Sequence, residues 1–246
     1  MENSAQRFSS DRVGREESLR NYMIQVYNYM ASALVLTGSI AIFTASFKEI
    51  IASIYLIVDN QVIGLSTLGW VVVMAPIGIA LVFSFKLNKM TAATAQFLFW
   101  TYSILLGFSL SLVFLTYTDE NIASIFFITA IIFSGMSIYG YTTKADLTSL
   151  GSFLIMALIG ILISSLVNIF FHNSLFNFIL SIVGVFVFIG LTAFDTQRLK
   201  NMYHLYSYNN SEIEDKIIII GALTLYLDFI NIFVHLLQLF GKRKGR

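Results

Sequence analysis

Long apolar runs without charged residues alternate with short polar segments along most of the chain. An apolar run of about 20 residues is long enough to cross a bilayer as a helix. The pattern predicts seven spans, at about 21–47, 64–85, 91–117, 121–141, 147–171, 175–194 and 217–241. A barrel would need short alternating strands instead. The sequence therefore predicts an all-α membrane protein with seven transmembrane helices.

The polar residues divide the chain into a cytoplasmic tail (1–20), a transmembrane domain (21–241) and a short basic tail (242–246). Lysine and arginine gather in the first tail, in the 86–90 turn and in the 196–216 connection, which alternating spans place on one side. Positive charge marks the cytoplasmic side. A full last span puts the basic tail on the opposite side, whereas a re-entrant last segment returns it to the cytoplasm. The length of the last run favours the full span.

Composition supports the membrane assignment and excludes several kinds of chemistry. The chain is 57% hydrophobic and 12% charged, whereas soluble domains are about 25% charged. It has no cysteine, which excludes disulfides, thiolate metal sites and a cysteine nucleophile. It also lacks phosphate-binding glycine loops and common hydrolase motifs. The basic residues do not form a patch interleaved with aromatic residues, so we do not expect the protein to bind nucleic acid. We expect neither an enzyme nor a cofactor.

Asp228 lies near the middle of the last apolar run. A charged side chain there costs about 3 kcal/mol even on lenient insertion scales, so it normally faces a protein interior or a water-filled cavity. Helical spacing places Thr224, Asn231 and His235 on the same stripe as Asp228. The sequence predicts a last helix that is enclosed by other helices and carries one polar seam.

Asp195 ends the sixth run, where Arg198 and Lys200 follow on the next turn. Taken alone, it reads as an interfacial acid paired with one of these cations. The sixth and seventh runs are consecutive and antiparallel, so the carboxyl groups of Asp195 and Asp228 could also meet. Two such groups at close range cannot both ionise cheaply and would share a proton. Without the proton, they would offer hard oxygen ligands to a divalent cation such as calcium.

The depth of Asp228 sets a condition on this pair. Asp228 lies about 16 Å along the helix from Ile217, where the last run begins. The two carboxyl groups meet only if the sixth helix continues past Arg198 and sits lower in the membrane, or if the cytoplasmic half opens as a wet vestibule.

Four further residues are auxiliary candidates. Lys86 and Arg198 could pair with a freed carboxylate as a latch, although each also reads as an ordinary cytoplasmic anchor. Asn231 and His235 share the stripe of Asp228. His235 could relay protons, although a histidine near a span end is more often an interfacial side chain.

Three segments carry a resemblance to a known family. LTAFDTQRLK (191–200), GALTLYLDFINIFVHLL (221–237) and YGYTTKADLTSLGSFLIMALIG (139–160) resemble the Bax inhibitor family, also called the transmembrane Bax inhibitor motif family, and the third is similar to its bacterial branch. The resemblance implies six helices in two layers of three around a central seventh. It also implies a calcium leak controlled by pH through two aspartates, which correspond here to Asp195 and Asp228.

The function we expect is a pH-sensitive calcium (cation) leak channel, with Asp195 and Asp228 as pH sensor and ion pathway. A proton-coupled transporter is the alternative within transport. A non-conducting membrane regulator of membrane proteases, or of stress and cell-death signalling, is the alternative from another class. The expected partners are the lipid bilayer, calcium or protons, and membrane proteins such as a protease. The expected location is the bacterial inner membrane, with a cytoplasmic N-terminus.

Overall fold

The computed structural model describes residues 2–58, 61–86, 90–171, 173–206 and 211–244. Residue 1 of the predicted first tail, 87–89 of the predicted basic turn and 245–246 of the predicted last tail lie outside them. In chain order the elements are α1 (Glu2–Ser46), α2 (Lys48–Ile54), β1 (Tyr55–Val58), β2 (Gln61–Leu65), α3 (Thr67–Lys86), α4 (Ala92–Thr116), α5 (Asp119–Thr142), α6 (Thr148–Phe171), α7 (Ser174–Tyr206) and α8 (Ser211–Phe240).

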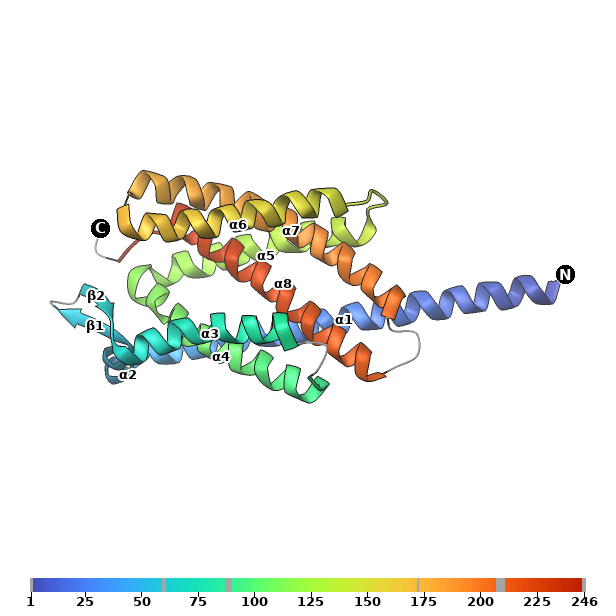
Figure 1. Ribbon diagram of the computed structural model, residues 1–246, viewed down its shortest axis with the longest axis horizontal. Helices are drawn as coiled ribbons and strands as arrows, with labels where there is room; N and C mark the ends of the chain where they lie inside the picture. The colour runs from blue at the N-terminus through green and yellow to red at the C-terminus, as the bar shows by residue number, and fades with distance from the viewer. Residues whose placement is uncertain (1, 59–60, 87–89, 172, 207–210, 245–246) are drawn as a thin grey trace.

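The long helices form two layers with α8 between them (Figure 1). α1, α3 and α4 make one layer, and α5, α6 and α7 make the other, while α8 packs against members of both. The apolar stretch of α8 is 72% buried, compared with at most 44% for the other spanning helices. The structure thus confirms two three-helix layers around a central C-terminal helix.

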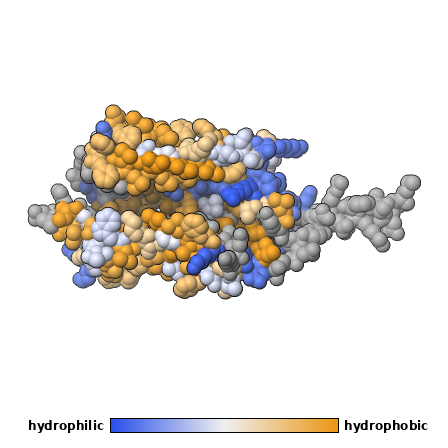
Figure 2. All heavy atoms as spheres, in the orientation of Figure 1, coloured by the Kyte–Doolittle hydropathy of each residue, from blue (hydrophilic) through white to orange (hydrophobic). Residues whose placement is uncertain are grey.

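Six described helices are long and apolar enough to cross a membrane: Glu16–Ser46 of α1, Ala92–Thr116, Asp119–Thr142, Thr148–Asn168, Ser174–Leu205 and Glu212–Phe240. The apolar part of α3, Thr67–Phe83, is shorter, so the predicted count of seven spans is not confirmed. Apolar side chains cover most of both layers on the face seen in Figure 2. Because such a surface suits contact with lipid, the chain is an all-α integral membrane protein.

The predicted start of the second span was wrong. Gly64 and Leu65 belong to β2, which pairs with β1 in an antiparallel hairpin that places Tyr55 opposite Leu65. The sequence YLIV followed by QVIGL is rich in β-branched residues, and such residues favour strands. The apolar run therefore begins as a hairpin, and the helix starts only at Thr67.

Several helices extend into segments that the charge pattern assigned to connections. α1 is helical from Glu2, and α7 continues to Tyr206 before α8 begins at Ser211. Most of the predicted 196–216 connection is therefore helix. Leu199 explains the extension of α7, because this side chain is only 3% exposed and continues the buried face of the helix among charged neighbours.

The C-terminal tail docks on the turn between α4 and α5. The Thr118 N–H donates to the Lys242 carbonyl at 3.0 Å, and the Lys244 ammonium lies 2.9 Å from the Asp119 carboxylate. α8 is one continuous helix that begins near the end of α7 and ends at the opposite side of the bundle, where the tail docks (Figure 1). The last segment therefore passes through the bundle from end to end. Which end faces the cytoplasm stays a prediction.

Candidate proton and ion site

Asp228 is buried on the central helix, with 4% of its surface exposed. Its Oδ2 atom has no hydrogen-bond partner among the described residues. A buried acceptor without a donor is costly, and more so when it belongs to an ionisable group. The fold thus encloses a carboxyl group without satisfying it, which is uncommon for a residue that only holds helices together.

Asp195 is the second acid buried in this region, with 7% of its surface exposed. It lies close enough to act on Asp228 electrostatically. On its other side, Arg198 Nη1 is 3.9 Å from Asp195 Oδ1, and the arginine side chain is 58% exposed. That distance is too long for a hydrogen bond, so the arginine neutralises Asp195 only loosely.

The continuation of α7 explains how the two acids approach each other. α7 continues about three turns beyond Asp195, and α8 begins before the apolar run at Ser211. Both carboxyl groups are therefore well inside the α7–α8 pair, which is in close contact along its length. The structure meets the first part of the condition set by the sequence, because the helix runs past Arg198. The depth of α7 in the membrane stays a prediction. The roles of the two aspartates stay predictions.

The residues directly after Asp195 fix this part of α7 in place. Gln197 accepts a hydrogen bond from the Leu147 N–H at 2.9 Å and donates one to the Ala145 carbonyl at 2.8 Å. It thereby holds the α5–α6 turn. Thr196 bonds Ser137 of α5 at 3.0 Å. Sequence reasoning missed both roles, although the polar pair within a buried stretch was a usable signal.

A close backbone approach also positions Asp195. A Cβ atom at Gly140 of α5 would lie 2.2 Å from the Ala193 carbonyl oxygen on α7. Any side chain at this glycine would push α7 away from α5. The missing side chain therefore sets the distance between the two helices about half a turn before Asp195.

His235 lies further along α8 and also faces α7. Its ring stacks on Phe188 with 5.8 Å between centroids, and a Cβ atom at Gly184 would lie 2.5 Å from His235 Nε2. His235 Nδ1 has no hydrogen-bond partner among the described residues. The α7–α8 seam thus contains a second ionisable group that is not fully bonded.

The remaining candidates do not join the aspartates directly. Asn231 donates to the Leu227 carbonyl of its own helix at 2.8 Å, and the Thr224 hydroxyl bonds the Ile220 carbonyl at 3.0 Å. Lys86 ends α3 in an exposed position. No ion pair between described side chains connects Lys86 with either aspartate. Of the two predicted latches, the structure brings only Arg198 to an acid.

Comparison with known sequences decides the family. Residues 19–245 match the family described as "Inhibitor of apoptosis-promoting Bax1". The chain belongs to the Bax inhibitor family. The match includes both aspartates and the whole of α8, so the resemblance predicted from three segments is confirmed.

Bacterial members of the Bax inhibitor family are similar over almost their whole length. The chain is 42% identical to "Inner membrane protein YbhL" of Escherichia coli K12 over 228 residues, which cover 92% of this chain and 93% of that protein. It is 47% identical to "Uncharacterized protein RP147" of Rickettsia prowazekii, with 93% and 92% covered. These relatives support an integral protein of a bacterial inner membrane. Their names give no sign of an enzymatic activity.

Proposed function

We propose that this Bax inhibitor family member is a pH-sensitive cation leak channel of the bacterial inner membrane, with calcium as its ion. One observation carries the proposal: two buried carboxyl groups, Asp195 and Asp228, lie within electrostatic range between α7 and α8. Ionisable residues inside a bundle usually mark ion or proton pathways.

The chemistry of the pair suits a proton and a cation in turn. Two carboxyl groups in a poorly hydrated site hold one proton between them, because two adjacent negative charges repel. When the proton leaves, the oxygens attract a divalent cation or the loosely held Arg198. Protons and divalent cations therefore compete for the same oxygens.

The donor set fits an ion in transit. The described residues contain no group of three or more His, Cys, Asp or Glu side chains that could hold a metal. Calcium in a permanent protein site takes six to eight oxygen ligands, and two carboxyl groups supply at most four. We therefore treat calcium as the transported ion and not as a bound cofactor.

Cation flux into liposomes that contain only the purified protein tests the proposal. Wild-type protein should conduct calcium with a clear pH dependence, and Asp228→Asn should remove that dependence while the protein still elutes as folded on size exclusion. The amide keeps the shape of the carboxyl group but cannot ionise. Asp146→Asn is the matched control. It makes the same chemical change at an exposed aspartate on the α5–α6 turn, away from the buried pair.

Three results would overturn the proposal. Normal pH dependence in Asp228→Asn would exclude Asp228 as the sensor. A wild-type protein that is folded and yet conducts nothing at any pH would favour a non-conducting membrane regulator, in which the carboxyl pair serves helix packing. Calcium uptake that requires a proton gradient would instead favour a proton-coupled transporter.

A further inference from the structure

A groove runs between α1 and α5 on the side of the bundle. It consists of two cavities placed end to end, of about 720 Å³ and 570 Å³. Leu34 on α1, Phe126 on α5 and Phe229 on α8 line both cavities. These three side chains mark the junction between the two cavities. The larger cavity is called the wide half below, and the smaller one the narrow half.

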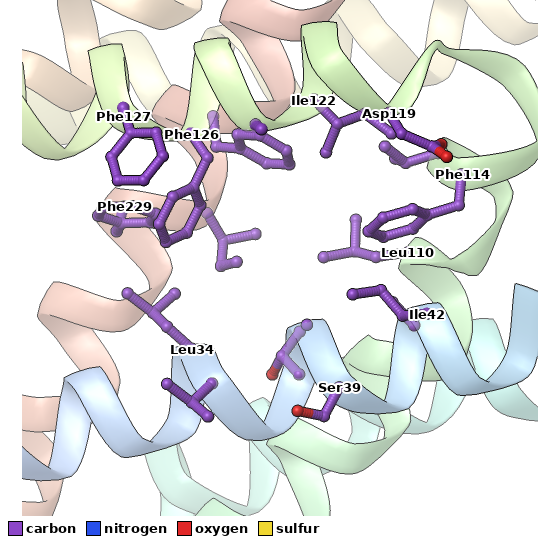
Figure 3. A pocket seen from close by; sticks show the side chains of 18 residues that line it. Leu34, Ser39, Ile42, Leu110, Phe114, Asp119, Ile122, Phe126, Phe127 and Phe229 are labelled. Atoms are coloured by element: carbon purple, nitrogen blue, oxygen red, sulfur yellow. The ribbon is translucent and has the colours of Figure 1, made fainter.

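The layered fold explains why this groove exists. α1 packs on α4 and α8, whereas α5 packs on α7 and α8. The two helices therefore leave space between them over much of their length, and α8 forms the floor of that space. Figure 3 shows the narrow half with α1 below, α5 above and Phe229 of α8 at one side. In the wide half, the Tyr27 hydroxyl bridges to Ser137 Oγ at 2.5 Å.

The length of the wide half suits the acyl chain of one leaflet. On α1 its lining residues extend from Arg20 to Leu34, which is about 21 Å of helix, whereas one leaflet is about half of the roughly 30 Å hydrocarbon core. The walls between these ends are mostly apolar. A Cβ atom added at Gly38 would meet nothing within 4 Å, so the narrow half is open beside this glycine.

The two ends differ in their charge. Asp119 lies at the narrow end and is already paired with Lys244 at 2.9 Å. Arg20 lines the wide end, and the ion pairs between described side chains do not include it. Lys200 reaches the same end, where its ammonium donates to the Tyr141 carbonyl at 2.9 Å. Glu16 and Glu17 precede Arg20 but do not line the cavity.

We propose that this groove binds an anionic phospholipid of the surrounding bilayer. The acyl chain lies between α1 and α5 against Phe126 and Phe229, and the phosphate meets Arg20 at the wide end. Lipid is the occupant because the groove opens sideways along the membrane-spanning parts of both helices, and basic residues near a membrane surface attract anionic lipids. The proposal does not depend on the channel function.

Photolabelling in a defined bilayer tests where the lipid lies. The full-length protein is reconstituted in phosphatidylethanolamine vesicles with a small share of phosphatidylglycerol that carries a diazirine on its acyl chain. After illumination, the label should concentrate on α1 and α5 around Leu34 and Phe126. Equal labelling of α6, whose outer face is exposed, would show only general lipid contact and would overturn the proposal.

Filling the groove supplies the matched variants. Ala31→Phe should reduce the labelling of α1 and α5 several-fold, because the ring occupies the wide half on the path of the acyl chain. Gly160→Phe is the control, since a Cβ atom at this α6 glycine meets nothing within 4 Å and Gly160 lines neither cavity. If Ala31→Phe fails to elute as folded, Gly38→Phe, one turn beyond Leu34 at the junction, replaces it. Unchanged labelling in the folded variant contradicts the proposal.

Arg20→Gln tests the headgroup. The preference for labelled phosphatidylglycerol over an equally labelled phosphatidylethanolamine should fall about fivefold, the change expected for one basic residue at an anionic surface. Lys48→Gln is the control for an exposed lysine on α2. An unchanged preference in Arg20→Gln would contradict the anionic headgroup. Absence of the lipid label from α1 and α5 together with elution of the protein as a dimer would overturn the proposal and show that a second copy covers the groove.

Discussion

Two neighbouring buried residues of α8, Tyr226 and Asp228, differ in how fully their polar atoms are hydrogen-bonded. Toward α1 and α4, the Tyr226 hydroxyl bonds Thr37 Oγ1 at 2.7 Å, and Thr37 donates onward to the Ser103 carbonyl at 2.9 Å. The Tyr226 ring also meets Phe99 and Tyr102 edge to face. Toward α7, Asp228 Oδ2 has no hydrogen-bond partner within the part of the chain that the structure describes.

This difference distinguishes a buried polar residue that stabilises the packing from one that is better explained by a function. Tyr226 and Asp228 are two residues apart and equally enclosed, with 0% and 4% exposed. The tyrosine is neutral and its hydrogen-bond chain ends on a backbone carbonyl, which stabilises one packing arrangement. The aspartate is ionisable and incompletely bonded, which costs stability. A costly group beside a well-satisfied one on the same helix is best explained by a function.

The largest effect is expected where both acids of the α7–α8 pair are changed. In a double-mutant cycle on calcium flux between about pH 6 and 8, Asp195→Asn and Asp228→Asn should be non-additive by about 0.5–3 kcal/mol. Each single change removes the repulsion that makes the two groups share a proton. Flux into liposomes gives all four values of the cycle.

The cycle also has a clear negative outcome. Additive free energies within about 0.5 kcal/mol would mean that the carboxyl groups act independently. Asp146→Asn combined with Asp228→Asn provides the reference, because Asp146 is an exposed acid on the α5–α6 turn.

A smaller effect, on stability and not on the pH dependence of flux, is expected where α8 faces α1 and α4. Tyr226→Phe should lower stability by up to about 1 kcal/mol, the usual net value of one hydrogen bond, because Thr37 keeps its bond to Ser103. The pH dependence of flux should not change. Thermal unfolding in detergent measures the first quantity, and Tyr139→Phe is the control at an exposed tyrosine on α5. Altered pH dependence in Tyr226→Phe would remove the distinction between Tyr226 and Asp228.

The smallest effect is expected at an acid that is fully bonded and exposed. Hydrogen bonds from the Thr148 hydroxyl and backbone N–H lower the pKa of Asp146 below its ordinary value of 3.8. A lowered folded-state pKa stabilises the protein above the unfolded value, and this contribution is lost as the pH falls through the folded value. Asp146→Asn should therefore be slightly less stable than wild type at pH 7, with the difference shrinking once the pH falls below about 4 and gone when the pH is below the folded pKa. Unfolding curves at pH 7 and in acid, below the folded pKa, measure the difference in stability between Asp146→Asn and wild type. A difference that persists in acid would contradict a lowered pKa of Asp146.

The sequence predicted the central helix because its evidence is local. One acid in the middle of an apolar run requires surroundings made of protein, and Asp228 alone therefore predicted the burial of α8. The layered arrangement came from the family resemblance and not from periodicity. Helices in a membrane are apolar on most faces, so the pattern itself does not show which helix lies next to which.

The parts that sequence reasoning missed depend on contacts between distant segments. Arg198 and Lys200 made the end of α7 look like a connection, although Leu199 continues its buried face. The hydrogen bonds of Gln197 to the α5–α6 turn join residues about 50 positions apart. The docking of Lys244 on Asp119 spans even more of the chain. No spacing rule within one segment predicts such pairs.

The central position of α8 has a consequence for biosynthesis. Every helix that surrounds α8 precedes it in the chain, so the ribosome delivers the middle of the bundle after its walls. At roughly 5–20 residues per second, the earlier helices wait in the membrane for seconds with their inner faces against lipid or each other. α8 brings an aspartate that lipid would reject, and this acid finds suitable surroundings only once both layers are present. The last step of assembly thus depends on an acid that only the earlier helices can enclose.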